Sequence, residues 1–291
     1  MKPRLLVIGG SGYLGDWVVR LARSTWDVTA TYFTHPVAHP GATWRHLDAR
    51  DADTVAALMA DAHPDAIVHT AAANPGPDAD FTGTNVTGTR NVARVAAGAG
   101  VRLVHVSTDV VFDGERGDYT EDDLPNPITE YGRSKALAEE EVSASGARAV
   151  IARTSIIYGW CPHIDRQARW ILDSLRDGTP IYLFADELRN PIWVESLAGA
   201  LVELAGHDYT GVLHIAGAHP LSRYEFGTRL ARFHGIDPGP ITAASSRASG
   251  LIRPLDCTLD CSKARTLLKT PLPGVDTVLH LPTNVKSEIS N

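Results

Sequence analysis

Three glycines near the N-terminus constrain the fold of this chain more than any other feature. Gly9, Gly12 and Gly15 follow the apolar run Leu5–Ile8 directly and open a stretch, Gly12 to Ser24, with the pattern of a helix. Gly9 can make a tight turn, Gly12 lets the backbone approach a pyrophosphate, and Gly15 lets helix and strand pack closely. The helix N-terminus then presents free N–H groups to the anion. A strand, a glycine turn and a helix in this order predict a dinucleotide-binding unit.

Short apolar runs alternate with amphipathic stretches through the rest of the first half. They predict strands over residues 27–32, 66–69, 101–106 and 148–153, and helices over residues 51–62, 85–97 and 130–143. Continuous apolar runs are typical of strands covered on both faces, and the alternation is typical of a parallel sheet with crossover helices. The predicted fold class is α/β, a Rossmann-like doubly wound parallel sheet with a smaller C-terminal α/β substrate-binding part.

The sequence changes in character after Gly159. We expect residues 1–159 to form an NAD(P)-binding Rossmann domain and residues 160–291 to form mainly the substrate-binding part, with some segments returning to the Rossmann core. The elements expected in this second part are helices over residues 167–176, 194–204, 223–233 and 262–268, and strands over residues 181–183 and 212–215. Frequent Pro and Gly from Pro238 on predict loops, and the polar tail after Pro282 is expected to be disordered.

Charge and cysteine content exclude several classes of function. The 291 residues include 27 Lys and Arg against 34 Asp and Glu, a net charge of −7, whereas a general nucleic-acid binder is usually basic. The first apolar run is too short for a signal core or a membrane span. Three cysteines with no Cys-x-x-Cys pair form no disulfide framework and fit a reducing compartment. We expect a cytoplasmic protein that binds no nucleic acid and no membrane.

The cysteines also indicate no metal site. Cys161 and His163 stand two apart, but a third ligand is not visible beside them. Cys257 and Cys261 are expected to be buried and inert. The prediction is therefore that the chain binds no metal ion.

The residues at the end of the second predicted strand bear on the choice of dinucleotide. NAD-binding proteins usually place Asp or Glu there, to hold the ribose 2′-hydroxyl. Here that stretch has no acidic residue that would repel a 2′-phosphate. Thr31, Thr34 or His35 could bind such a phosphate, and Arg45 or Arg50 could come near it. The predicted cofactor is NADPH, with NADH left open.

Tyr131 and Lys135 are candidate catalytic residues. They stand four apart in the predicted helix 130–143 and therefore share one face. An ammonium near a phenol lowers the pKa of the phenol, so that Tyr131 could exchange a proton near neutral pH while Lys135 holds ribose hydroxyls. Thr108 follows the strand 101–106, at the edge where ligands collect in an open parallel sheet, and its hydroxyl could bond a carbonyl oxygen beside the phenol.

Together these motifs resemble the extended short-chain dehydrogenase/reductases, and more narrowly their dTDP-4-dehydrorhamnose reductase type. The resemblance covers nearly the whole chain up to about residue 282, and Ser107 to Gly114 is its most specific block. The other matching blocks are Gly9 to Gly15, Leu47 to Asp51, His69 to Ala73, Asn85 to Thr89, Tyr131 to Lys135, Arg153 to Gly159, His214 to Gly217, Arg253 to Asp256 and Leu259 to Lys263.

The resemblance implies roles for individual residues. Thr108 orients the carbonyl, Tyr131 is the general acid in the reductive direction, and Lys135 binds the ribose and tunes the phenol. Asn85 is expected to support the sheet, and Asp109 to make a structural hydrogen bond at the end of its strand. The residues expected to bind the cofactor are Gly9, Gly12, Tyr13, Leu14, Gly15, Thr31, Asp48, Ala49, Thr70, Ala71, Ala72 and Lys135.

The substrate side departs from the family pattern. Val110 stands where the family usually has Tyr, and Ile156 where it usually has a Trp that packs against the sugar. An aliphatic side chain offers no aromatic face to a pyranose. Arg189 could grip an anion such as a pyrophosphate or form an ordinary surface salt bridge, and both interpretations stay open. The expected substrate-binding residues are Thr108, Val110, Tyr131, Ile156 and Arg189.

The leading hypothesis is NAD(P)H-dependent reduction of a ketone to an alcohol, with a nucleotide-activated 4-keto-6-deoxy sugar as the best substrate candidate. The altered pocket also allows another small or natural-product ketone. Two further alternatives are a non-catalytic NADP-binding regulatory subunit, of the kind known for methionine adenosyltransferase, and an epimerase or dehydratase that recycles its cofactor. The expected partner is a small-molecule substrate, and a homodimer stays open because such folds commonly pair.

Overall fold

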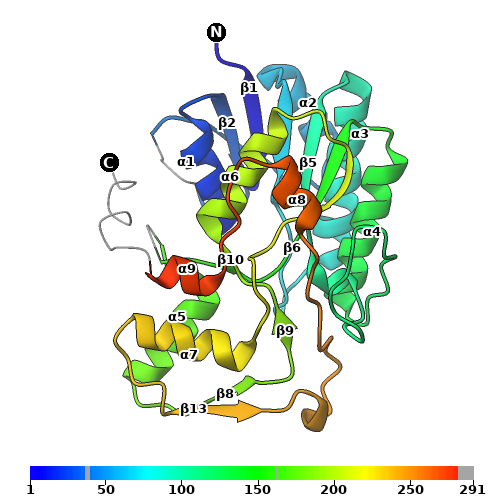
Figure 1. Cartoon of the computed structure of the whole chain (residues 1–291). Coiled ribbons are helices and arrows are strands. Elements are labelled where there is room, and N and C mark those ends of the chain that lie inside the picture. Colours follow the sequence, from blue (N-terminus) through cyan, green and yellow to red (C-terminus); the bar gives the residue numbers. More distant parts are fainter. Residues whose placement is uncertain (37–39, 161–162, 281–291) are drawn as a thin grey trace.

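A seven-stranded parallel sheet forms the centre of the molecule in a computed structural model, which describes residues 1–36, 40–160 and 163–280 (Figure 1). From one edge to the other, the strands are β11 (Gly211–His214), β6 (Ala149–Thr154), β5 (Arg102–Thr108), β4 (Ala66–His69), β1 (Arg4–Ile8), β2 (Asp27–Tyr32) and β3 (Thr43–His46). Each neighbouring pair is parallel. The order reverses between β1 and β4, so the sheet is doubly wound, as the sequence predicts.

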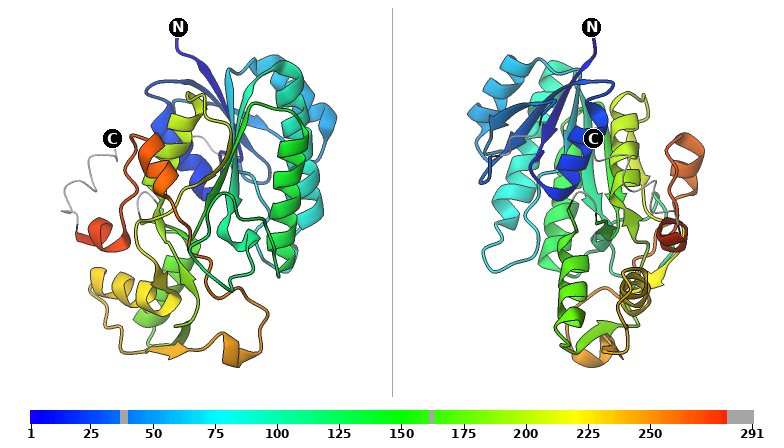
Figure 2. Two further views of the ribbon diagram at one scale, coloured as in Figure 1. Left: turned by 45° about the vertical axis from the view of Figure 1, so that its right-hand side comes forward. Right: turned by 90° about the vertical axis from the view of Figure 1, so that its left-hand side faces the viewer.

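Helices cover both faces of this sheet (Figure 2). One layer contains α1 (Tyr13–Ala22), α6 (Val194–Ala205) and α8 (Ser262–Leu267), and the other contains α2 (Ala52–Ala62), α3 (Thr89–Ala99) and α4 (Glu130–Ala144). Val68 and Val104 pack into the first layer, whereas Ile67 and Leu103 pack into the second. Strands buried on both faces need no polar positions, which explains their unbroken apolar runs.

A smaller α/β part lies beyond the carboxyl ends of the sheet strands, at the lower end of Figure 1. Its helices are α5 (Arg166–Arg176), α7 (Arg223–Phe233) and α9 (Val275–His280). Its strand pairs are β8 (Ile181–Phe184) with β13 (Ile241–Ala244), β9 (Leu188–Arg189) with β12 (Leu221–Ser222), and β7 (Ile157–Tyr158) with β10 (Ile192–Trp193). The remaining elements are the π-helix η1 (Phe81–Gly88) and the short 3-10 helices η2 (Asp109–Val111) and η3 (Arg247–Ser249).

The predicted helices and strands are present, with small differences at their ends. The helix predicted over 85–97 begins as η1 and continues as α3. The strand β3 was not predicted from the sequence, because this edge strand is mostly exposed and has no apolar run. The prediction of loops after Pro238 is wrong where β13 and α9 form.

Two predictions concern the organisation of the chain. The tail after Pro282 lies outside the described residues. The division at residue 159 stays a prediction, although β11 joins the central sheet and α6 packs on it, far along the chain from the other Rossmann elements. Among the helices of the described residues, none is long and apolar enough to cross a membrane.

Candidate active site

The reversal of strand order between β1 and β4 coincides with a cavity of about 530 Å³ at the carboxyl ends of the strands. In an open α/β sheet, ligands bind at such a switch point. Every residue that the sequence analysis assigned to the cofactor lines this cavity. These residues are Gly9, Gly12, Tyr13, Leu14, Gly15, Thr31, Asp48, Ala49, Thr70, Ala71, Ala72 and Lys135.

The glycine turn at one side of this cavity has the form of an anion cradle. Gly9 has a φ of 86°, in the left-handed region, and a Cβ there would lie 2.6 Å from the backbone nitrogen of Ala71. A Cβ on Gly15 would lie 2.1 Å from the carbonyl oxygen of Gly9. Gly12 is the N-cap residue of α1, and no side chain caps the helix there. The first N–H groups of α1 are therefore available to an anion, which fits the diphosphate of a dinucleotide.

Arg50 and Asp48 form the other end of the cavity. The Nη2 atom of Arg50 lies 2.8 Å from Oδ2 of Asp48, and its Nη1 atom lies 3.1 Å from Oδ2 of Asp80. The hydrogen bond from Arg50 lowers the pKa of Asp48 below its usual value. The guanidinium carbon of Arg50 lies 5.1 Å from the centre of the Phe33 ring, so Arg50 places a cation in the cavity lining beside the end of β2.

Of the five residues suggested as ligands of a 2′-phosphate, only Thr31 and Arg50 line the cavity. The Thr31 hydroxyl accepts a 3.0 Å hydrogen bond from the backbone N–H of Gly9, so it holds the glycine turn. Thr34 and His35 bond to each other at 2.8 Å, and Arg45 lies 3.4 Å from Asp61. The structure therefore does not bring Thr34, His35 and Arg45 to the site.

A second cavity, of about 840 Å³, adjoins the first. Thr108, Tyr131 and Ser155 line both cavities. The two candidate catalytic hydroxyls thus lie where the cavities meet, which is where a cofactor and a substrate would touch. All the residues predicted to bind substrate line the second cavity, namely Thr108, Val110, Tyr131, Ile156 and Arg189.

The environment of Tyr131 corrects the sequence-based expectation of a lowered phenol pKa. Burial raises the pKa of Tyr131 to about 12, the Asp109 carboxylate adds to the rise, and a hydrogen bond with Thr108 opposes it. The charge of Lys135 does not offset these effects. Tyr131 therefore keeps its proton throughout the neutral range, so the phenol is in the acid form that proton donation needs.

Lys135 lies in the floor of the first cavity and is 2% exposed. Its Nζ atom donates a hydrogen bond of 2.7 Å to the carbonyl oxygen of Val106 and lies 3.5 Å from Nε2 of His105. Burial lowers the pKa of Lys135 to about 8, and the charge of Glu139 opposes that fall. The ammonium is charged at neutral pH and fixed against β5.

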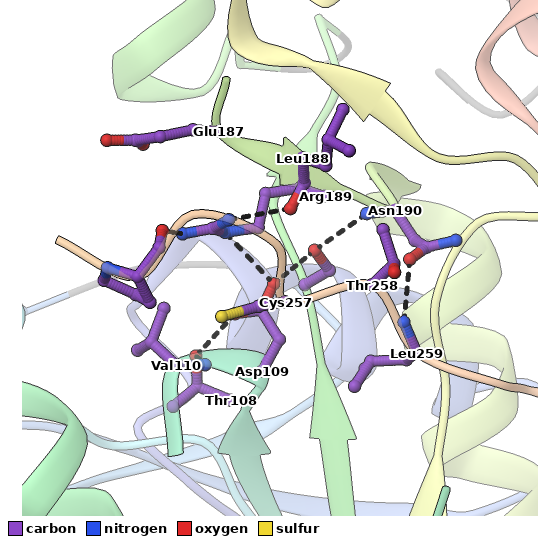
Figure 3. A network of polar contacts seen from close by, with 12 residues as sticks. Thr108, Asp109, Val110, Glu187, Leu188, Arg189, Asn190, Cys257, Thr258 and Leu259 are labelled. Carbon is purple, nitrogen blue, oxygen red and sulfur yellow. Dashed lines mark hydrogen bonds and ion pairs between the residues drawn. The ribbon is translucent and has the colours of Figure 1, made fainter. Parts of the chain in front are cut away.

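Asp109 and Arg189 form the centre of a buried polar network (Figure 3). Ser155 donates a 2.6 Å hydrogen bond to Oδ2 of Asp109, and Nε of Arg189 lies 3.6 Å from the same oxygen. The guanidinium also donates to the carbonyl oxygens of Leu188, Leu255 and Pro254. These contacts agree with the structural role expected for Asp109.

The location of Arg189 corrects one of the two interpretations of this residue. Arg189 is 2% exposed, so its ion pair is buried, and the reading as an ordinary surface salt bridge is wrong. Most of its N–H donors already bond to backbone carbonyls. It lines the second cavity with few donors left for an anion, and a role in substrate binding stays a proposal.

Other predicted residues have the environments that the sequence suggested. Asn85 is fully buried and bonds through its amide to both backbone groups of Ala73 and to the Ser134 hydroxyl, so it ties the loop after β4 to α4. Cys257 and Cys261 are buried, and burial raises the pKa of the Cys261 thiol to about 12. Both thiols are therefore poor nucleophiles.

Across 1–36, 40–160 and 163–280, no group of three or more His, Cys, Asp and Glu side chains is arranged to hold a metal ion. Cys161 lies outside the described residues.

Gln167, Arg223 and Arg253 are among the polar residues of the second cavity that were not singled out from the sequence. Arg223 donates a 2.8 Å hydrogen bond to Gln167, and Arg253 donates one of 3.0 Å to the buried Glu187. Arg253 belongs to a block that matched the family, so a signal for it was present. Gln167 and Arg223 lie at the starts of ordinary amphipathic helices, and nothing in their spacing marks them.

Comparison with known proteins shows which family has this sequence. Residues 2–281 match the family described as RmlD substrate binding domain. A dTDP-4-keto-6-deoxy-D-glucose reductase of Streptomyces niveus is 32% identical over 96% of each chain. Methionine adenosyltransferase 2 subunit beta of Xenopus tropicalis is 29% identical, over 89% of this chain and 81% of its own.

The fold is also similar to that of a solved structure. A dTDP-4-dehydrorhamnose reductase of Bacillus anthracis in complex with NADP has a TM-score of 0.82 and 24% identity, over 96% of this chain and 98% of its own. The doubly wound sheet and the part beyond it therefore recur together in that protein.

Proposed function

The chain belongs to the RmlD substrate binding domain family, and from that premise we propose that it is an oxidoreductase that reduces a ketone to an alcohol with NADPH. The observation that supports this best is the position of Thr108 and Tyr131, which line the cofactor cavity and the second cavity alike. A carbonyl group held at that junction would meet both hydroxyls at once.

The roles of the residues follow from their positions. When bound, the cofactor supplies the hydride for the carbonyl carbon. Tyr131 donates its proton to the carbonyl oxygen, and the Thr108 hydroxyl orients that oxygen. Lys135 holds the ribose, and the remaining residues that line the first cavity bind the rest of the dinucleotide.

Arg50 favours NADPH over NADH in this proposal. Its guanidinium lines the cavity and lies over the ring of Phe33, just after the second strand, where a 2′-phosphate would lie. The Bacillus anthracis reductase is described as a complex with NADP, which is consistent with the same choice here. The ion pairs of Arg50 with Asp48 and Asp80 already engage part of its guanidinium group. NADH therefore remains a weaker second cofactor.

The proposed substrate is a nucleotide-activated 4-keto-6-deoxy sugar. The Streptomyces niveus relative is named for such a substrate. Val110 and Ile156 give the second cavity an aliphatic wall where the family usually has aromatic rings. For that reason a small or natural-product ketone is the alternative substrate of the same reaction.

A non-catalytic regulatory role is the second candidate function. It is favoured by the similarity to methionine adenosyltransferase 2 subunit beta. The complete set of Thr108, Tyr131 and Lys135 at one junction is the observation against it. An epimerase or dehydratase would keep its cofactor bound through purification, which distinguishes that alternative. A cytoplasmic location is part of the proposal and rests on the sequence, and a homodimer stays open because such folds commonly pair.

The test is a titration of the purified protein with NADPH and NADH, followed by tryptophan fluorescence. The same sample is then assayed for NADPH oxidation with dTDP-4-keto-6-deoxy sugars and with a panel of other ketones. Binding with turnover is the expected result. Binding without turnover on any ketone, together with a stable complex with methionine adenosyltransferase, would favour the regulatory alternative.

A further inference from the structure

Two buried histidines lie side by side behind the candidate catalytic lysine, and the proposed mechanism does not use them. His69 is the last residue of β4 and His105 lies in the middle of β5, and their Cα atoms are paired in register. They are 1% and 0% exposed, and their ring centroids are 5.3 Å apart. Imidazoles fully buried in the core of a sheet are costly unless they have partners.

The two rings differ in what they contact. The Nε2 atom of His105 lies 3.5 Å from Nζ of Lys135, whereas Nε2 of His69 lies 3.3 Å from the Thr89 hydroxyl on α3. The Nδ1 atoms of both rings are buried without a hydrogen-bond partner among the described residues. Burial, with the charge of Lys135, lowers the pKa of His69 to about 3 and that of His105 well below its usual value. Both rings are therefore neutral at physiological pH.

A neutral imidazole beside an ammonium must accept rather than donate. An ammonium has only donors, so Nε2 of His105 has to carry the lone pair and Nδ1 the proton. That tautomer leaves Nδ1–H unpaired in the core. The contact with Lys135 is therefore the interaction that fixes the ring, because no other polar partner of the His105 side chain is present in the described structure.

We infer that His105 is a positioning residue, which holds the Lys135 ammonium so that one N–H points into the cofactor cavity. Of the three N–H donors of Lys135, one bonds to the carbonyl oxygen of Val106 and one faces His105. The third is left for the cavity that Lys135 lines, where the ribose hydroxyls would accept it. The inference rests on the proposed function, because it assigns Lys135 to the cofactor.

Other charged groups near Lys135 do not replace this contact. Glu139, one turn further along α4, attracts the ammonium, but its oxygens bond to Ser107 on β5 and to Arg153 on β6. His69 on β4 contributes no hydrogen bond to Nζ. His105 is thus the nearest side-chain acceptor, and its loss would weaken the hold on the charged form of Lys135.

The experiment measures the dissociation constant of NADPH against pH, by nicotinamide fluorescence, in the wild-type protein and matched variants. His105→Leu removes the acceptor, His105→Gln keeps an acceptor near the position of Nε2, and His69→Leu removes an equally buried imidazole that does not bond Lys135. The melting temperature of each variant is measured in parallel, so that loss of fold and loss of the contact are told apart.

His105→Leu is expected to weaken NADPH binding about tenfold and to move the alkaline midpoint of binding down by about one pH unit, the size of one hydrogen bond to a charged group. His105→Gln and His69→Leu should keep the wild-type midpoint. Equal shifts in His105→Leu and His69→Leu, or no rescue by His105→Gln, would overturn the inference.

A second pair of variants covers the case in which His105→Leu does not fold. The Asn side chain in His105→Asn is polar like that in His105→Gln but too short to reach Nζ of Lys135. Only His105→Asn should therefore shift the alkaline midpoint of NADPH binding to lower pH. Identical binding curves for the two variants would also overturn the inference. A wild-type protein that binds NADPH normally while these comparisons fail leaves the proposed function intact. A wild-type protein that binds no NADPH at any pH overturns both.

Discussion

The Nζ atom of Lys135 donates a hydrogen bond of 2.7 Å to the carbonyl oxygen of Val106. Val106 lies on β5 two residues before Thr108, and Lys135 lies on α4 one turn after Tyr131. This single contact therefore links the strand that positions one candidate catalytic hydroxyl to the helix that positions the other. Two rigid elements hold the site before any ligand arrives, as efficient catalysis requires.

The buried ammonium predicts how cofactor affinity depends on pH. Since the pKa of Lys135 is lowered to about 8, its charge is complete at lower pH and is lost as the pH rises through that value. Above about pH 7, where the 2′-phosphate is fully ionised, the dissociation constant of NADPH should therefore rise across this transition. Fluorescence titrations of wild type and Lys135→Met measure this. Lys135→Met should bind NADPH weakly and show no pH transition near 8. If its dissociation constant changes with pH in the same way as that of the wild type, Lys135 does not contact the cofactor.

Arg50 is predicted to set the preference for NADPH. Arg50→Gln should weaken NADPH binding roughly tenfold, because a charge-assisted contact with the 2′-phosphate is lost, and should leave NADH binding almost unchanged. Arg45→Gln is the matched control, since Arg45 pairs with Asp61 away from the cavity. If Arg50→Gln weakens both cofactors equally, Arg50 supports the fold of the cavity rather than selecting the phosphate.

The close packing of the glycine turn makes a prediction about stability. Gly15→Ala should destabilise the protein by about 1–3 kcal/mol, because the new Cβ would lie 2.1 Å from the carbonyl oxygen of Gly9. Gly98→Ala is the control, since Gly98 is in helix α3 with no atom near its Cβ position, and it should be stabilising by up to about 1 kcal/mol. Urea denaturation compares the two, and similar midpoints would contradict the turn geometry.

Arg189 is predicted to act mainly in stability. Arg189→Met removes the bonds to backbone carbonyls and leaves Asp109 without its buried cation, at a cost of about 3 kcal/mol in unfolding free energy. Arg133→Met, at an exposed position of the same cavity, should cost less than about 0.5 kcal/mol. A stable Arg189→Met protein with a raised KM for substrate would instead support the anion-binding interpretation of Arg189.

Much of the fold and of the cofactor site could be predicted from the sequence. The glycine turn, the Tyr131–Lys135 pair and the strand before Thr108 are local patterns, and each is set by spacing along a single element. Parallel topology then brings the strand ends to one edge, so residues as distant as Gly9 and Lys135 could be assigned to one cavity before the structure was known.

What the sequence could not supply depends on contacts between distant segments. Arg189 is buried because residues 254 and 255 provide carbonyl oxygens for it, and no local pattern records that pairing. The pKa of Tyr131 rises because burial and the Asp109 carboxylate outweigh the hydrogen bond with Thr108, whereas sequence spacing showed only the nearby Lys135. The short edge strand β3 was missed for a similar reason, since pairing with β2 rather than an apolar run defines it.

The most direct test of the account is the comparison of wild type with Tyr131→Phe under single-turnover conditions, with NADPH bound and a dTDP-4-keto-6-deoxy sugar added. The exposed Tyr182→Phe is the control. The account predicts that all three proteins bind NADPH alike, and that only Tyr131→Phe loses turnover, by at least about a hundredfold, because the proton donor is gone. A Tyr131→Phe protein that keeps most of its activity would contradict the proposed mechanism.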